Sequence, residues 1–173
     1  LEARFPFGRY AEQAQLELIY ARYMSFDLEG ATAAAERFVR LHPQHSNIDY
    51  AFYIKGLAGI GQNEGLMDRL FETDTSKRDM VPMRQAYADF GQLLARYPTS
   101  QYAPDATQRM IHLRNRLADY EIYVARYYLD RGAYIGAAQR AKQTIEQFDG
   151  APAIRDALEV MITAYDALGM QEL

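Results

Sequence analysis

The stretch from Tyr102 to Asp130 constrains the fold of this chain more than any other part of the sequence. It contains no glycine, and its only proline lies near its start. Apolar side chains recur along it in steps of four and three residues, at Ala106, Met110, Leu113, Leu117, Tyr120, Val124 and Tyr127. This spacing predicts one α-helix with an apolar face, and such a face is stable only when it packs against other helices. At about 1.5 Å per residue the helix is roughly 40 Å long, so we expect a spine helix with shorter helices on both sides.

Local signals predict both ends of this spine helix. Thr99 and Ser100 are capping candidates just upstream, and Pro104 stands in the first turn, where its missing N–H costs nothing. At the other end, Arg131 precedes Gly132, the residue best able to adopt the left-handed conformation that closes a helix. The predicted helix therefore runs over residues 102–130.

Short breaks near residues 6, 43, 98 and 149 divide the chain into repeating helical stretches. Eight positions after each break stands a small residue, which indicates close approach of helices: Ala14, Ala51, Ala106 and Ala157. Ala86, Phe90 and Pro98 fit the second-helix half of the tetratricopeptide pattern best, and the first two breaks are separated by close to the roughly 34 residues of that class. We predict a single helical-repeat array over residues 1–173, in which each repeat buries its face against its neighbours.

The predicted fold is all-α, a tetratricopeptide-type superhelix of antiparallel helix pairs. Its helices are expected at residues 8–25, 28–42, 46–61, 82–96, 102–130, 133–148 and 151–168, with a further helical turn possible at 65–71. The spacing leaves an insertion at residues 61–82. An insertion on one face of a repeat array often carries binding function, and it is equally compatible with a tolerated surface loop.

The composition excludes several classes of site. Because the 173 residues include no cysteine, they hold no disulfide, thiolate metal site or thiol nucleophile. A net charge of −4 with interspersed signs gives no reason to expect nucleic acid as a partner, and no apolar run approaches the length of a membrane span.

A basic run on the spine helix is interpreted as a solvated face balanced by nearby acids. It comprises Arg109, His112, Arg114 and Arg116, with Asp105, Asp119 and Glu121 as the acids.

No motif for catalysis, for a cofactor or for a metal is present. His42 and His45 flank Pro43 in a predicted turn, and no carboxylate cluster completes a metal site. A helical-repeat enzyme such as a transglycosylase would need a buried glutamate with a raised pKa in a cleft, and no glutamate stands in an apolar setting that suggests one. We therefore expect no enzymatic activity.

Two groups of residues are candidates for binding other proteins. Arg140 lies among small residues of a predicted helix, where a partner backbone could come close and offer a carboxylate; an ordinary exposed arginine is the alternative. Aromatic side chains of the first two repeats could line a groove for an extended peptide, although packing between helices also explains them. They are Phe5, Tyr10, Tyr20, Tyr23, Tyr50 and Tyr53.

Several segments together carry a resemblance to a known family. They are RFPFG at residues 4–8 with its continuation at 10–23, RFVRLHP at 37–43, NIDY at 47–50, KRD at 77–79, RYPTSQY at 96–102, LADYE at 117–121 and RGA at 131–133. In this combination, which runs the length of the chain, the sequence resembles the BamD family, the tetratricopeptide-repeat lipoproteins of the bacterial outer-membrane β-barrel assembly (BAM) machinery. The first helix of the family's first repeat and its lipidated cysteine are missing, and the insertion around residues 72–82 differs from the usual sequence of the family. Residues 1–4 read like the end of a helix that begins upstream, so we expect a fragment whose targeting signal or lipid anchor would precede it.

The resemblance implies a scaffold at the periplasmic face of the outer membrane, held to the membrane only through that lipid anchor. The C-terminal repeats would bind the periplasmic POTRA domain of BamA, with Arg140, Tyr127, Tyr128 and Arg131 as the candidate residues. The N-terminal repeats would meet unfolded outer-membrane protein precursors and other BAM lipoproteins. Their candidate residues are Phe5, Phe7, Gly8 and Tyr10. A generic tetratricopeptide adaptor, unrelated to outer-membrane assembly, is the alternative.

Overall fold

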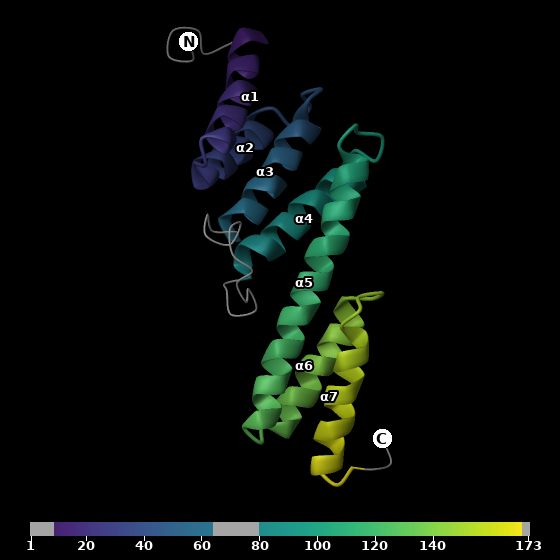
Figure 1. Ribbon diagram of the computed structural model, residues 1–173. Helices are drawn as coiled ribbons and strands as arrows, with labels where there is room; N and C mark the ends of the chain where they lie inside the picture. The colour runs from purple at the N-terminus through teal and green to yellow at the C-terminus, as the bar shows by residue number, and fades with distance from the viewer. Residues whose placement is uncertain (1–8, 64–79, 171–173) are drawn as a thin grey trace. The chain divides into compact units, whose positions relative to one another are not determined.

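The computed structural model describes residues 9–63 and 80–170, which form helices joined by short turns (Figure 1). The helices are α1 (Arg9–Met24), α2 (Leu28–Leu41), α3 (Ile48–Asn63), α4 (Val81–Arg96), α5 (Ala103–Asp130), α6 (Tyr134–Gln147) and α7 (Ile154–Ala167). No strand occurs in the described ranges, so the predicted all-α class is confirmed. None of the helices described is long and apolar enough to cross a membrane.

Each helix expected within the described ranges is present, with ends that differ from the prediction by three residues or fewer. The spine helix is α5, and Gly132 closes it at a φ of +72° as predicted. The two ends of the predicted insertion at 61–82 are helical, because residues 61–63 continue α3 and residues 81–82 begin α4. The possible turn at 65–71 lies outside the described residues.

Packing divides the described residues into two compact units, described here one at a time. The first holds α1 to α4 and the start of α5 up to Met110, and the second holds α5 from Ile111 onward with α6 and α7. In the first unit, α1 packs on α2, α2 on α3, and α3 on α4; in the second, α6 packs on α7 (Figure 1). That the whole chain forms one continuous array stays a prediction.

Small residues allow the helices of the first unit to approach closely. Three of the four alanines predicted from the repeat, Ala51, Ala106 and Ala157, are fully buried in their units. In α3, a Cβ atom added to Gly56 would lie 2.6 Å from Cζ of Phe90 in α4, closer than side-chain atoms tolerate. The close packing of α3 against α4 therefore requires glycine at this position.

The first unit also buries a charged side chain that sequence reasoning missed. Asp89 of α4 is 1% exposed, and Nζ of Lys55 in α3 lies 3.0 Å from its Oδ1. Nζ of Lys55 also lies 3.0 Å from Oε1 of Glu36 in α2, and Gln85 donates a hydrogen bond to Oδ1 of Asp89. Burial by itself would lower the pKa of Lys55, but the hydrogen bonds and charges of the two carboxylates raise it above its usual value. Burial raises the pKa of Asp89, and Lys55 lowers it again only in part. One lysine thus links three helices.

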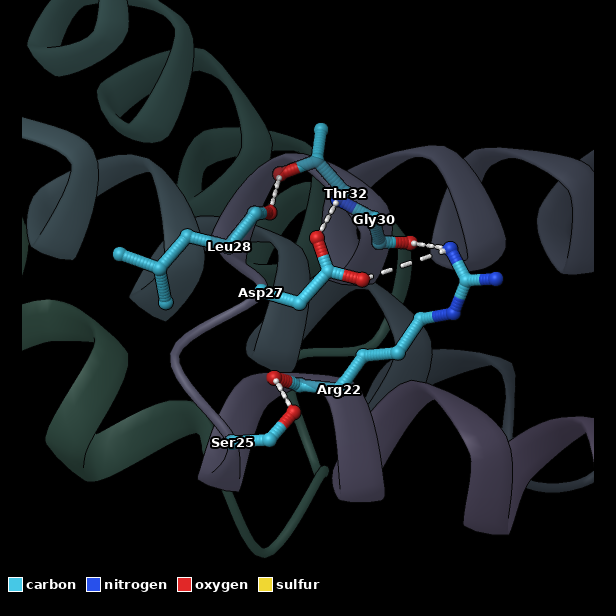
Figure 2. A network of polar contacts seen from close by, with 6 residues as sticks. All are labelled: Arg22, Ser25, Asp27, Leu28, Gly30 and Thr32. Carbon is cyan, nitrogen blue, oxygen red and sulfur yellow. Dashed lines mark hydrogen bonds and ion pairs between the residues drawn. The ribbon is translucent and has the colours of Figure 1, made fainter.

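The turn between α1 and α2 is held by a network of polar contacts (Figure 2). Asp27 caps α2, because its Oδ1 accepts a hydrogen bond of 3.0 Å from the backbone N–H of Gly30. Arg22 reaches across from α1, where its Nη1 donates to the carbonyl oxygen of Gly30 at 3.2 Å and lies 3.8 Å from Oδ2 of Asp27 (Figure 2). A Cβ at Gly30 would lie 2.1 Å from Oδ2 of Asp27, so only glycine at this position avoids a clash with the capping carboxylate.

The same turn places Phe26 in the left-handed region, at a φ of +61°. Glycine occupies the left-handed positions of other turns, at Gly132, Gly150 and Gly169, where φ is between +71° and +72°. In this conformation the Cβ of an L-residue comes too close to the backbone, which costs about 1–2 kcal/mol. Phe26 therefore stores backbone strain in the α1–α2 turn.

Candidate partner-binding surfaces

The four C-terminal candidates all lie in the second unit, and contacts connect them. Tyr127 and Tyr128 stand in the last turn of α5, Arg131 follows that helix, and Arg140 lies in α6. The guanidinium of Arg131 lies 4.8 Å from the centroid of the Tyr127 ring, an arrangement typical of a cation–π contact. The Tyr127 ring is in turn 6.2 Å from that of Tyr128, and Tyr127 is 47% exposed. The end of α5 thus presents two tyrosines and an arginine as one group.

Arg140 is held by a buried carboxylate. Its Nη1 donates a hydrogen bond of 2.7 Å to Oε2 of Glu121 in α5, whose side chain is only 7% exposed, whereas that of Arg140 is 38% exposed. The hydrogen bond to Glu121 is the largest cause that raises the pKa of Arg140, and Tyr128 adds a smaller contribution. The guanidinium therefore has one side fixed inside the unit and part of its surface open to solvent.

The expectation that small residues open the surrounding surface to a partner is wrong. Ala137, Ala138 and Ala141 are buried in the packing of the second unit. A Cβ at Gly136 would lie 3.3 Å from Cδ2 of Tyr128, so that tyrosine already covers the glycine. The three alanines therefore serve the packing of helices within the unit and are not open to a partner.

Glu121 is the residue of this surface that sequence reasoning missed, and its assignment to a solvated face is wrong. The apolar pattern predicted a face through Tyr120, Val124 and Tyr127, yet none of these is buried. The buried stripe of this half of α5 runs instead through Leu113, Leu117, Glu121 and Ala125. A step of four from Leu117 to Glu121 and on to Ala125 was the available signal. Glu121 is buried, but it is paired with the guanidinium of Arg140 at 2.7 Å.

The basic run of α5 makes contacts within the protein. Arg109 pairs with Asp105 one turn before it. Arg114 donates from Nη1 to the carbonyl of Asp149 at 2.8 Å and from Nη2 to that of Gly150 at 3.0 Å, which holds the turn between α6 and α7. His112 is exposed, as expected. The interpretation as a purely solvated face is therefore wrong for Arg114.

Of the four N-terminal candidates, the structure describes only Tyr10. This side chain lies in the first turn of α1 and is 85% exposed. Phe5, Phe7 and Gly8 lie outside the described residues, so their role stays a prediction.

A polar groove lies in the first unit between α1, the α2–α3 turn and the α4–α5 turn, with a volume of about 650 Å³. Tyr50 lines it, and burial, followed by the charges of Tyr102 and Glu17, raises the pKa of Tyr50 to about 12. Tyr53 stacks on Tyr102 at a centroid distance of 4.6 Å and donates a hydrogen bond of 2.7 Å to Asp105, so it packs α3 against the start of α5. Of these tyrosines, Tyr50 faces the groove and Tyr53 serves packing.

The structure brings a carboxylate to the two histidines that the sequence left without one. Nδ1 of His42 and Nε2 of His45 lie 3.5 and 3.6 Å from the two carboxylate oxygens of Glu12 in α1. Both rings also pack on Phe38, at centroid distances of 5.0 and 5.1 Å. Within residues 9–63 and 80–170 no group of side chains is arranged to hold a metal ion. The histidines thus join α1 to the α2–α3 turn.

Comparison with known proteins places the chain in a family. A family model described as outer membrane lipoprotein, YfiO, matches residues 1–173. The chain is 44% identical over 172 residues to the outer membrane protein assembly factor BamD of Vibrio cholerae, covering 99% of this chain and 71% of the relative. It is 44% identical to BamD of Neisseria meningitidis serogroup A and 40% identical to BamD of Xylella fastidiosa, in each case over the whole chain. The chain spans 65% and 59% of the length of these last two relatives. Since the family model covers every residue, the chain belongs to the YfiO family of outer membrane lipoproteins.

Proposed function

We propose that this chain is part of a non-enzymatic scaffold of the outer-membrane β-barrel assembly machinery, associated with the outer membrane as its family is. The observation that carries the proposal is the second unit's surface of Arg140, Tyr127, Tyr128 and Arg131 in a chain whose relatives are named outer membrane protein assembly factors. Arginine and tyrosine are the residue types most enriched at the energetic centres of protein interfaces. The periplasmic location and the lipid anchor upstream are parts of the same proposal.

The second unit would bind the periplasmic POTRA domain of BamA through this surface. The exposed ring of Tyr127 and the guanidinium of Arg131 above it offer a large contact area at little cost in conformational entropy, because the two side chains already touch. Arg140 would add a charged hydrogen bond to an acidic side chain of the partner. Together they supply an aromatic anchor beside a directional charged contact.

The first unit would meet precursors of outer-membrane proteins and other lipoproteins of the complex. Its groove is lined by groups that suit an extended segment, including the side-chain amides of Gln13, Asn47 and Gln101, which can hydrogen-bond to a peptide backbone. Tyr10, Phe5, Phe7 and Gly8 are further candidates for contact with a precursor. Glu121 does not indicate an enzyme, because it is buried against Arg140, where a substrate cannot reach it.

Calorimetry with the periplasmic portion of BamA from the same organism tests the proposal in the full-length protein. We expect Arg140→Glu to weaken binding by at least about tenfold, since a hydrogen bond to a charged group contributes about 1.5–3 kcal/mol. Arg126→Ala is the matched control, because Arg126 is a 55% exposed arginine of α5 that pairs with Asp156 in the same unit. Unfolding must be measured for each variant, because Arg140 also satisfies the buried Glu121. Absence of binding by the folded wild-type protein would refute the BamA assignment and favour the generic adaptor.

A further inference from the structure

We propose that Glu121 is a positioning residue for partner recognition: its buried carboxylate fixes the guanidinium of Arg140 and leaves the outer edge of that group to bind an acidic side chain of the partner. This role of Glu121 rests on the proposed function. Its basis is a carboxylate 7% exposed that contacts an arginine 38% exposed at 2.7 Å.

The geometry leaves Arg140 donors for a partner. A guanidinium has five N–H donors in a rigid fork, and the bond to Glu121 uses Nη1. The other donors of the group are not used by Glu121, the side chain is 38% exposed, and Tyr128 is a second hydrogen-bonding neighbour that raises the pKa of Arg140. The fork is therefore oriented before a partner arrives.

Orientation of this kind has a measurable effect on affinity. A free arginine loses rotamer freedom when it binds, whereas one already anchored by a carboxylate has lost part of that freedom in the unbound protein. The anchor has to be buried to act in this way, because an exposed carboxylate would itself be mobile and solvated. At 5% exposure for the whole residue, Glu121 meets this condition.

A different role for Arg140 in the Arg140–Glu121 pair predicts the opposite change in affinity when Glu121 is removed. If Arg140 acts only as a positive charge, the nearby carboxylate weakens its attraction for an acidic partner, and removal of that carboxylate tightens binding. If Glu121 positions Arg140, its removal weakens binding, mainly through faster dissociation. The sign of the change therefore distinguishes positioning from simple charge.

The test is Glu121→Gln in the full-length protein, with the periplasmic portion of BamA as the probe and surface plasmon resonance as the readout. We expect Glu121→Gln to weaken binding by roughly threefold to tenfold through a higher dissociation rate. Asp156→Asn is the matched control, since Asp156 is an exposed carboxylate that pairs with Arg126 at 2.9 Å in the same unit. Binding by Asp156→Asn should stay within about twofold of wild type.

A double-mutant cycle separates positioning from a general loss of structure. In an Arg140→Gln background, Glu121→Gln should have no further effect on affinity, because the group that it positions is gone. Glu121→Asp provides a second variant should Glu121→Gln fold poorly, and its shorter side chain should also raise the dissociation rate. Unchanged or tighter binding by folded Glu121→Gln, or an equal loss in both backgrounds, would overturn the inference. A wild-type protein that does not bind the probe would overturn the proposed function instead.

Discussion

Replacing Lys55 by methionine should strongly destabilise the first unit, because it leaves the carboxylate of Asp89 buried without its cation. Asp89 is 1% exposed, and Nζ of Lys55 lies 3.0 Å from its Oδ1. Removing one partner of a buried ion pair costs about 3–5 kcal/mol. Gln85 still donates a hydrogen bond of 3.1 Å to the same oxygen, so we expect a loss near the lower limit, about 3 kcal/mol.

Urea denaturation followed by circular dichroism measures this loss. For a slope of about 1–3 kcal/mol per molar urea, a loss of about 3 kcal/mol lowers the midpoint by roughly 1–3 M. The loss should shrink as the pH is lowered, because a protonated Asp89 needs no cation. Arg155→Ala is the control: Nε of Arg155 lies 3.4 Å from Oε1 of Glu159, but the side chains are 86% and 58% exposed, so its loss should stay within about 0.5 kcal/mol.

The double variant Lys55→Met/Asp89→Leu completes the experiment. With both charges replaced by apolar groups, no buried carboxylate is left unpaired, and most of the stability should return. This variant tests the same ion pair even where Lys55→Met alone does not fold. A Lys55→Met loss no larger than that of Arg155→Ala, or a double variant less stable than Lys55→Met, would show that Lys55 does not stabilise a buried carboxylate.

Four further substitutions test the turns and one pH-dependent contact by the same urea measurements. Gly30→Ala should lose about 0.5–2 kcal/mol, because its Cβ displaces the capping carboxylate of Asp27, and no loss would contradict that account. Phe26→Gly should raise the free energy of unfolding by up to about 1 kcal/mol, because glycine adopts a φ of +61° without steric cost. Gly132→Ala should lower it by a similar amount, because the φ there is +72°, although nothing lies within 4 Å of the new Cβ. A destabilised Phe26→Gly would argue against strain at Phe26. Burial alone would raise the pKa of Asp105, but the hydrogen bonds from Tyr53 and Arg109 lower it below 3.8. The stability that ionised Asp105 contributes is therefore present above pH 3.8 and is lost as the pH falls through the lowered pKa. In Asp105→Asn, the free energy of unfolding should depend less on pH on the acid side. An unchanged pH dependence would exclude this effect.

The α-helices and their approximate ends followed from local chemistry. Periodic apolar residues, Pro104 in a first turn and Gly132 after a last turn act within a few residues of chain, and the structure has α5 over Ala103–Asp130, close to the prediction. The recurrence of alanine after each break also identified buried positions, such as Ala51 and Ala106, since only a small residue permits close contact of helices. These features depend on neighbours that are near in the sequence.

The buried charges depended on the folded chain. Asp89 and Glu121 look like surface residues in the sequence, because carboxylates are rarely buried without a partner. Their partners, Lys55 and Arg140, stand on other helices, and no local pattern indicates which cation comes within 3 Å of which acid. Helix formation is read from short-range periodicity, whereas the pairing of buried charges, and with it the orientation of the arginine offered to a partner, arises only when separate helices pack.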